Sequence, residues 1–273
     1  MQTLSLFLGS KKVDEWYNKY HKKNWLPFFD RLKDVAPLII FSGEIGCGKT
    51  ALAQSIATPL AKELDTKISV FESPSNVRGS GMVGELSNRI SEMFTSAKSK
   101  LGKDKAGILI IDEADDIATS RAQNQAHHED RAGLNILIKQ IDRISKEDYK
   151  LAVILITNRV TVIDPAIRRR ASLNLTFERP NGEVVNKLFK HIFNGIELKK
   201  EDLANLTQIV KSKDIPYSFS DLVDRAGKQA LSYAIHKDVP FSVKIYKEAL
   251  QSIEPSPLIK ETSISNMNQN GRN

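Results

Sequence analysis

The feature that most constrains the fold is the segment "GEIGCGKT", Gly43 to Thr50, which directly follows the apolar run "PLIIFS". It matches G-x-x-x-x-G-K-[ST], a loop whose backbone N–H groups point at the β- and γ-phosphates of a nucleotide. The surrounding pattern predicts a buried strand over 37–42 and a helix over 49–64 whose N-terminus faces the phosphates. This order of elements indicates a nucleotide-binding α/β fold.

Each residue type in the loop has a physical reason. The glycines let the backbone turn tightly, Lys49 adds a positive charge at the phosphates, and the Thr50 hydroxyl can bind Mg²⁺. The residues expected to contact the nucleotide are Gly43, Glu44, Gly46, Cys47, Gly48, Lys49, Thr50 and Ala51.

Strands and helices alternate from about Pro37 to Pro180. Besides the first strand, strands are expected at 67–73, 107–113, 151–158 and 172–177, and the helix between the third and fourth has one apolar face made of Leu134, Leu137, Ile138, Ile141 and Ile144. Near-continuous apolar runs between helices are typical of a parallel sheet covered on both faces. The sequence therefore predicts a parallel five-stranded sheet with helices on both sides.

Four regions are expected along the chain. Residues 1–36 form short N-terminal helices, and 37–180 the α/β nucleotide-binding domain. Residues 181–253 form a small helical domain with helices near 181–194, 199–211, 218–237 and 239–253. The Ser/Asn/Pro-rich residues 254–273 are expected to be a disordered tail.

Composition excludes several classes of protein. The 273 residues carry a net charge of +7, which permits a nucleic-acid or acidic partner, but the cations are scattered as on a solvated surface. A single cysteine, Cys47, rules out an internal disulfide and fits a reducing compartment. The apolar run in the start "MQTLSLFLGSKK" is too short for a signal peptide, and no run reaches the length of a membrane span. We expect a soluble cytoplasmic protein.

The acidic pair in "ILIIDEAD" lies at the end of the third predicted strand. Asp112 is placed to hold Mg²⁺ or its water, and Glu113 to orient and polarise an attacking water. The letters DEAD also name a helicase family, but that family needs two tandem recombinase-like domains and a longer chain. The helicase interpretation is therefore rejected.

Two further polar segments complete the predicted site. Asn158 ends the strand "LAVILITN" and can fix the attacking water from the other side. The segment "IDPAIRRRAS" carries three arginines, and Arg is well suited to a transition-state phosphate. One of the three can equally be a solvated basic residue.

In this order and spacing, the motifs from about Pro37 to Ile253 resemble an AAA+ ATPase module: an α/β nucleotide domain followed by a helical lid. The resemblance makes Gly43–Thr50 Walker A, Asp112–Glu113 Walker B and Asn158 sensor 1. It implies ATP and Mg²⁺ as cofactors, ATP hydrolysis, and a homo-oligomeric ring, usually a hexamer.

In such a ring a finger arginine serves the neighbour's nucleotide. The resemblance places Arg170 at the finger position, with Arg169 as second choice. The lid departs from the family pattern, because Ser220 falls where the sensor 2 arginine is expected. Arg225, one turn further on, is an alternative.

The segment "RGSGMVGELSNRI" resembles the pore loop of protein-remodelling AAA+ enzymes, with Met82 at the aromatic position and Val83 beside it. A flexible thioether can grip varied polypeptide sequence. Local packing of Met82 and Val83 is the alternative. His127 and His128 fall in a second pore-facing loop or are solvated.

The segments "LNILIKQIDRI" and "ITNRVTVIDPAIRRRAS" resemble the pachytene-checkpoint-type remodellers of HORMA-domain proteins, in the compact bacterial form associated with CBASS antiphage operons. The resemblance implies disassembly or partial unfolding of a HORMA-domain protein bound to a nucleotide cyclase. A nucleic-acid-directed AAA+ ATPase, such as a loader or transposition helper, would suit the basic charge. A scaffold that binds nucleotide without hydrolysis is a third alternative.

Overall fold

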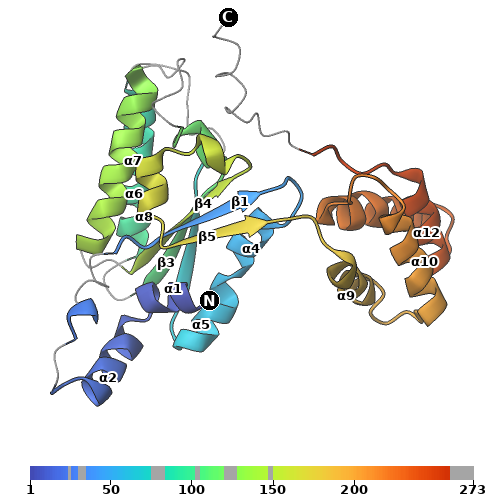
Figure 1. Ribbon diagram of the computed structural model, residues 1–273, viewed down its shortest axis with the longest axis horizontal. Coiled ribbons are helices and arrows are strands. Elements are labelled where there is room, and N and C mark those ends of the chain that lie inside the picture. Colours follow the sequence, from blue (N-terminus) through green and yellow to red (C-terminus); the bar gives the residue numbers. More distant parts are fainter. Residues whose placement is uncertain are drawn as a thin grey trace, which may run out of the picture. The chain divides into compact units, whose positions relative to one another are not determined.

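The computed structural model describes residues 1–23, 26–29, 35–74, 84–101, 105–119, 128–146 and 150–258. Contacts divide the chain into two units (Figure 1). The α/β unit comprises residues 1–42 and 49–176, and the helical unit comprises residues 43–48 together with the chain after residue 176. The phosphate loop itself, 43–48, is thus grouped with the helical unit, while the residues directly after it belong to the α/β unit.

The α/β unit is built on a five-stranded parallel sheet with the strand order β2-β3-β4-β1-β5. Its strands are β1 (Leu38–Gly43), β2 (Ile68–Glu72), β3 (Ala106–Ile111), β4 (Leu151–Thr157) and β5 (Leu173–Phe177). In the register, Ile40 pairs with Leu155 and Leu109 pairs with Val153. Strands β3 and β4 are buried along their whole length, as strands covered on both faces must be. The five predicted strands and the parallel sheet are confirmed.

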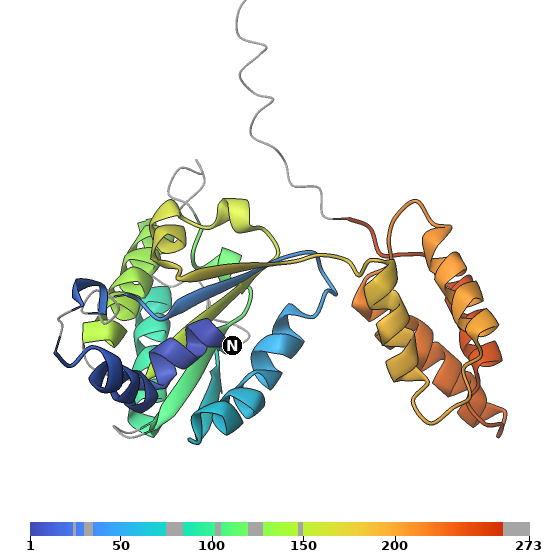
Figure 2. The same cartoon turned by 60° about the horizontal axis from the view of Figure 1, so that its bottom comes forward.

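Helices cover both faces of this sheet (Figures 1 and 2). On one face, α6 (Glu85–Leu101), α7 (His128–Lys146) and α8 (Pro165–Arg170) share an apolar core with alternate residues of β1, β3 and β4. Helices α1 (Gln2–Leu8) and α4 (Lys49–Ser55) contact β4, and α5 (Ala57–Leu64) contacts β2. The predicted helix with the leucine and isoleucine face is α7, and its Leu134, Leu137, Ile141 and Ile144 are fully buried.

The helix expected over 49–64 is divided into two pieces, α4 and α5, with a turn at Ile56. Pro59 lies in the first turn of α5, where its missing N–H removes the bond that a continuous helix would make to the Ser55 carbonyl. The first turn of a helix tolerates proline because the N–H groups there have no partner within the helix, so a new helix begins two residues before Pro59.

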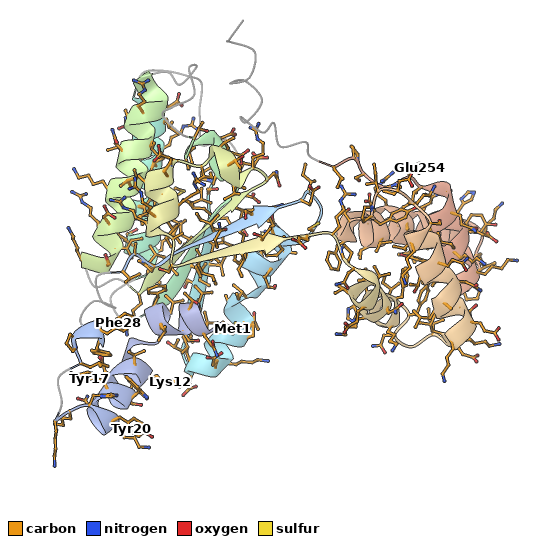
Figure 3. All side chains as sticks on the ribbon, in the orientation of Figure 1. Met1, Lys12, Tyr17, Tyr20, Phe28 and Glu254 are labelled. Carbon is orange, nitrogen blue, oxygen red and sulfur yellow. The ribbon has the colours of Figure 1, made fainter. Side chains whose placement is uncertain are left out.

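The N-terminal segment contributes to the α/β unit. Leu4 and Leu8 of α1 are buried, and Ser5 Oγ donates a 2.8 Å hydrogen bond to Glu63 Oε1 of α5. In α2 (Ser10–Tyr20), the ring of Tyr17, which is labelled in Figure 3, stacks on Phe29 with centroids 4.0 Å apart. Helix α1 therefore packs on the sheet domain, and α2 stacks on Phe29 within the N-terminal segment.

The helical unit contains α9 (Gly182–Ile192), α10 (Lys200–Lys211), η3 (Asp221–Gly227), α11 (Lys228–His236) and α12 (Val243–Ser252). Its core includes Phe189 and Phe193, which meet Tyr246 edge-on with centroids 5.9 and 5.3 Å away. The helix expected over 218–237 contains a π-helical stretch, η3, which no local sequence signal predicted. Such turns are frequent at functional sites.

Among the described residues, no helix is long and apolar enough to cross a membrane.

Candidate active site

The phosphate loop adopts a backbone that only glycine takes easily. Gly43, Gly46 and Gly48 have φ angles of +122°, +71° and +88°. A β-carbon at Gly43 would lie 2.1 Å from the Phe177 carbonyl oxygen, and one at Gly46 would lie 2.9 Å from Ser218 Oγ. The glycines expected from the motif thus meet both a conformational and a steric requirement.

The residues that follow the loop begin α4 in the α/β unit. Lys49 is 6% exposed, and the Thr50 hydroxyl donates a 2.7 Å hydrogen bond to Asp112 Oδ2 at the end of β3. Cys47 is buried at the end of the loop, and Ala51 is exposed on α4. The structure therefore brings together two of the predicted residues, Thr50 and Asp112, which lie far apart in the sequence.

This pair fits Mg²⁺, because a hydroxyl and a carboxylate are hard oxygen ligands. In the described part of the chain, no three His, Cys, Asp or Glu side chains gather into a metal-binding group. A site with one carboxylate and one hydroxyl is typical of Mg²⁺ that is bound mainly through substrate phosphates and water.

Glu113 lies next to this pair in a left-handed backbone conformation, with φ of +51°. Its N–H donates to Asp112 Oδ1 at 2.8 Å, so the two Asp112 oxygens are divided between Thr50 and the Glu113 backbone. The Glu113 side chain is exposed, as a group that activates water requires. A non-glycine residue in this region is strained, and such strain gathers at active sites.

Asp115 and Thr157, which the sequence interpretation missed, connect the end of β3 to the end of β4. Thr157 is buried, and its hydroxyl donates to Asp115 Oδ1 at 3.1 Å. The Arg159 N–H in turn donates to Thr157 Oγ1 at 3.0 Å. The half-buried Asn158 lies between these bonded residues, so the loop that carries it is fixed beside the acidic segment. The second Asp of "DEAD" and the Thr before Asn158 were the available signals.

The three arginines of α8 differ in their surroundings. Arg170 makes a bidentate pair with Asp142 of α7, with Nε–Oδ1 and Nη2–Oδ2 distances of 2.7 and 3.0 Å. These hydrogen bonds raise the pKa of the Arg170 guanidinium. Arg169 is exposed, and its Nε donates at 3.3 Å to the Pro165 carbonyl, while Arg168 is also exposed. Asp142 was not predicted as a site residue.

The lid residues considered for sensor 2 make other contacts. The Ser220 N–H donates to the Gly46 carbonyl at 3.0 Å. Arg225 Nη1 donates to Asp221 Oδ1 and to the Glu254 carbonyl, both at 2.7 Å. Arg225 is therefore bonded within the helical unit. Met82, Val83 and His127 lie outside the described residues, and His128 begins α7.

Comparison with known proteins agrees with this geometry. Residues 39–179 match the family described as "ATPase family associated with various cellular activities (AAA)". "CD-NTase-associated protein 6" of Escherichia coli strain KTE188 is 37% identical over 259 residues, which cover 94% of this chain and 86% of that protein.

Solved structures give the same result over 94% of the chain. One is the "Structure of E. coli MS115-1 HORMA:CdnC:Trip13 complex", with a TM-score of 0.82, 32% identity, and coverage of 94% of this chain and 87% of that one. Another is the "Structure of Rhizobiales Trip13", with a TM-score of 0.68, 26% identity, and coverage of 94% and 88%. The chain is therefore a nucleotide-binding ATPase of the AAA family, related over nearly its whole length to CD-NTase-associated protein 6.

Proposed function

We propose that this ATPase is a cytoplasmic protein remodeller of a bacterial CBASS antiphage system. Its substrate would be a HORMA-domain protein bound to a nucleotide cyclase, which it would disassemble or partly unfold at the expense of ATP. The observation that carries the proposal is the similarity, over 94% of this chain, to a chain of the E. coli structure titled with HORMA, CdnC and Trip13.

In this proposal the residues around the loop divide the work of hydrolysis. The amides of the loop and Lys49 bind the phosphates, and Thr50 and Asp112 hold Mg²⁺. When bound, Mg²⁺ neutralises charge on the phosphate oxygens. Glu113 accepts a hydrogen bond from the attacking water, and Asn158 orients that water. The hydrogen bond between Asp115 and Thr157 supports this role, because it fixes the loop that carries Asn158.

The subunits would assemble into a ring, a hexamer by analogy with the family, in which Arg170 completes the neighbour's site with help from Arg169. In the single chain the Arg170 guanidinium is held by the bidentate pair with Asp142 and by a 3.1 Å hydrogen bond from Nη1 to the Ala166 carbonyl. On assembly of the ring, the Arg170 guanidinium would then either leave Asp142 or contact the neighbour's nucleotide while it keeps Asp142. Met82 and Val83 are proposed to grip the polypeptide in the central pore.

Partner-stimulated ATP turnover tests this function. Turnover is measured for the chain alone, with a HORMA-domain protein encoded beside it, and with DNA. Stimulation by the protein that is lost in Met82→Ala, while basal turnover survives, is the expected result. Stimulation by DNA alone, equal in Met82→Ala, would instead favour a loader or transposition helper, which the net charge of +7 would suit.

A further inference from the structure

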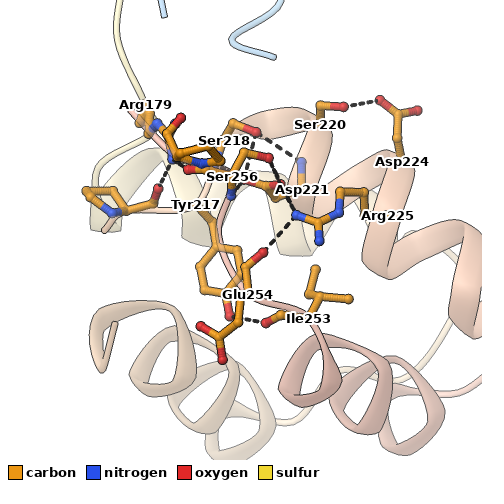
Figure 4. Close-up of polar contacts among 12 residues, drawn as sticks. Arg179, Tyr217, Ser218, Ser220, Asp221, Asp224, Arg225, Ile253, Glu254 and Ser256 are labelled. Atoms are coloured by element: carbon orange, nitrogen blue, oxygen red, sulfur yellow. Dashed lines mark hydrogen bonds and ion pairs between the residues drawn. The ribbon is translucent and has the colours of Figure 1, made fainter. Parts of the chain in front are cut away.

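A short C-terminal segment of the helical unit makes hydrogen bonds to buried side chains of that unit. Residues 254–258, "EPSPL", form what we call the C-terminal strap. Pro255 and Pro257 have no N–H, so Ser256 is the one residue between Glu254 and Leu258 that can donate a backbone hydrogen bond. That N–H donates to Asp221 Oδ2 at 3.1 Å, and the Ser256 hydroxyl donates to Asp221 Oδ1 at 2.6 Å (Figure 4). Ser256, near the start of the expected disordered tail, is thus bonded twice to Asp221.

Asp221 is the acceptor at the centre of this arrangement. Its side chain is fully buried, and it also accepts from the Ser218 N–H and Oγ, both at 2.9 Å, and from Arg225. Burial alone would raise the pKa of Asp221, but hydrogen bonds from Ser256, Ser218 and Arg225 lower it to about 2. The carboxylate is therefore charged at neutral pH and binds the strap as an anion.

Arg179 holds the other side of the strap. This arginine lies two residues after the end of β5, and its side chain is only 4% exposed. Nη1 donates to the carbonyls of Ser256 at 2.8 Å and Pro216 at 2.5 Å, and Nη2 donates to the Pro257 carbonyl at 2.9 Å. Three backbone carbonyls from two segments thus fix the guanidinium.

The same guanidinium reaches the phosphate loop. Arg179 Nη2 lies 3.5 Å from Glu44 Oε2, and Glu44 is the residue after Gly43, within the helical unit. The Glu44 N–H donates at 3.0 Å to the carbonyl of Phe177, two residues before Arg179. A side chain fixed by the strap therefore contacts the loop that is proposed to bind phosphates.

We infer that Arg179 is a positioning residue for the phosphate loop, and that the C-terminal strap holds Arg179 in the required orientation. Without the strap, the Ser256 and Pro257 carbonyls are lost and the guanidinium can leave Glu44. The loop would then have to be ordered by the nucleotide itself, which lowers affinity. This inference rests on the proposed nucleotide role of the loop.

The test separates nucleotide affinity from turnover. KM and kcat for ATP, and the affinity for a fluorescent ADP analogue, are measured for Arg179→Ala and for a chain ended after Ile253. We expect KM and Kd to rise about tenfold, the effect of losing one hydrogen bond to a charged group, with kcat within about twofold. A chain ended after Leu258 keeps the strap and is the matched control, with unchanged constants.

Conservative variants distinguish positioning from folding. Arg179→Lys keeps the charge beside Glu44 but cannot span the carbonyls, so an intermediate KM is expected. Glu44→Gln combined with Arg179→Ala should raise KM by less than the product of the single effects, because each variant breaks the same Arg179–Glu44 contact. The inference would be overturned if the effects of the two substitutions on KM multiplied. It would also be overturned if the variants lowered kcat and the melting temperature while KM stayed unchanged. These point variants decide the question even if the shortened chain does not fold. Wild-type ADP affinity in Lys49→Ala would instead refute the proposed nucleotide role of the loop.

Discussion

The α/β unit and the helical unit hold their key side chains by different kinds of contact. In the α/β unit, Thr50 at the start of α4 bonds to Asp112 directly after β3, so two polar side chains meet each other. In the helical unit, Arg179 bonds mainly to backbone carbonyls. The first arrangement places groups that can act on a phosphate, and the second fixes the loop on which those phosphates would lie. Substitutions among the polar side chains of the α/β unit should therefore change ATP turnover. Substitutions around Arg179 in the helical unit should change nucleotide affinity and stability.

The largest expected effect is on turnover, from Arg170→Ala. If Arg170 serves the neighbouring subunit, its loss should lower kcat by about 10³- to 10⁵-fold. Arg169→Ala, a change on the same helix, should have a much smaller effect. Rings mixed from Arg170→Ala and Glu113→Gln subunits should regain activity, because each supplies what the other lacks. Inactive mixed rings would contradict a role in trans.

Glu113→Gln should lower kcat by about 10²- to 10⁴-fold, because the amide cannot accept the proton of the attacking water. Nucleotide affinity should stay at the wild-type value, since the Glu113 backbone N–H that bonds Asp112 is kept. Single-turnover hydrolysis and ADP-analogue titration measure the two quantities separately. A loss of nucleotide affinity in Glu113→Gln as large as the loss of kcat would contradict the division of turnover and affinity between the two units.

Asp221→Ala should destabilise the helical unit by about 3 kcal/mol, because it leaves the buried Ser218 donors and the Arg225 charge without their acceptor. Urea unfolding followed by circular dichroism measures the change. Asp224→Ala, one turn away and exposed, is the matched control with a change below about 0.5 kcal/mol. Equal effects of the two variants would show that the buried contacts of Asp221 contribute no more to stability than the exposed contacts of Asp224.

Stability should depend on pH through Asp221. Its pKa is about 2 in the folded chain and 3.8 without its contacts, so the folded state binds the proton less readily. The stabilisation, roughly 2 kcal/mol, is complete above about pH 4 and is lost as the pH falls toward 2. The difference between wild type and Asp221→Ala in urea midpoint should shrink over that range. A constant difference would contradict the low pKa.

The smallest effect is expected from Thr157→Val, which removes the hydroxyl bonded to Asp115 at nearly constant volume. The cost of about 1 kcal/mol should appear as a few-fold loss of kcat, since Asn158 is less well fixed. Steady-state assays suffice, with Thr176→Val on β5 as the control. An unchanged kcat would mean that the Asp115 bond does not position Asn158.

The α/β unit was predictable because its signals are local. Apolar runs mark the strands, and the glycines and acids directly follow them, so "GEIGCGKT" and "ILIIDEAD" located Thr50 and Asp112 before any contact was known. The break between α4 and α5 could also have been predicted, because Pro59 lacks the N–H that a continuous helix needs.

The strap and the π-helical stretch were not predictable in this way. Arg179, Asp221 and Ser256 lie in three separate segments, and each bonds to partners that the chain brings together only on folding. A Ser/Pro-rich segment resembles disorder by composition, and only the buried Asp221 gives the lone Ser256 N–H a partner. Asp142 was not predictable either, because it meets Arg170 only when α7 packs beside α8.

The central claim is that the chain uses ATP to take apart a HORMA-domain protein and its nucleotide cyclase. The direct measurement is the fraction of that complex, labelled on the cyclase, that remains associated after incubation with the chain and ATP. The account predicts dissociation by the wild type and none by Glu113→Gln. A complex that stays intact while the wild type hydrolyses ATP at an unchanged rate would contradict it.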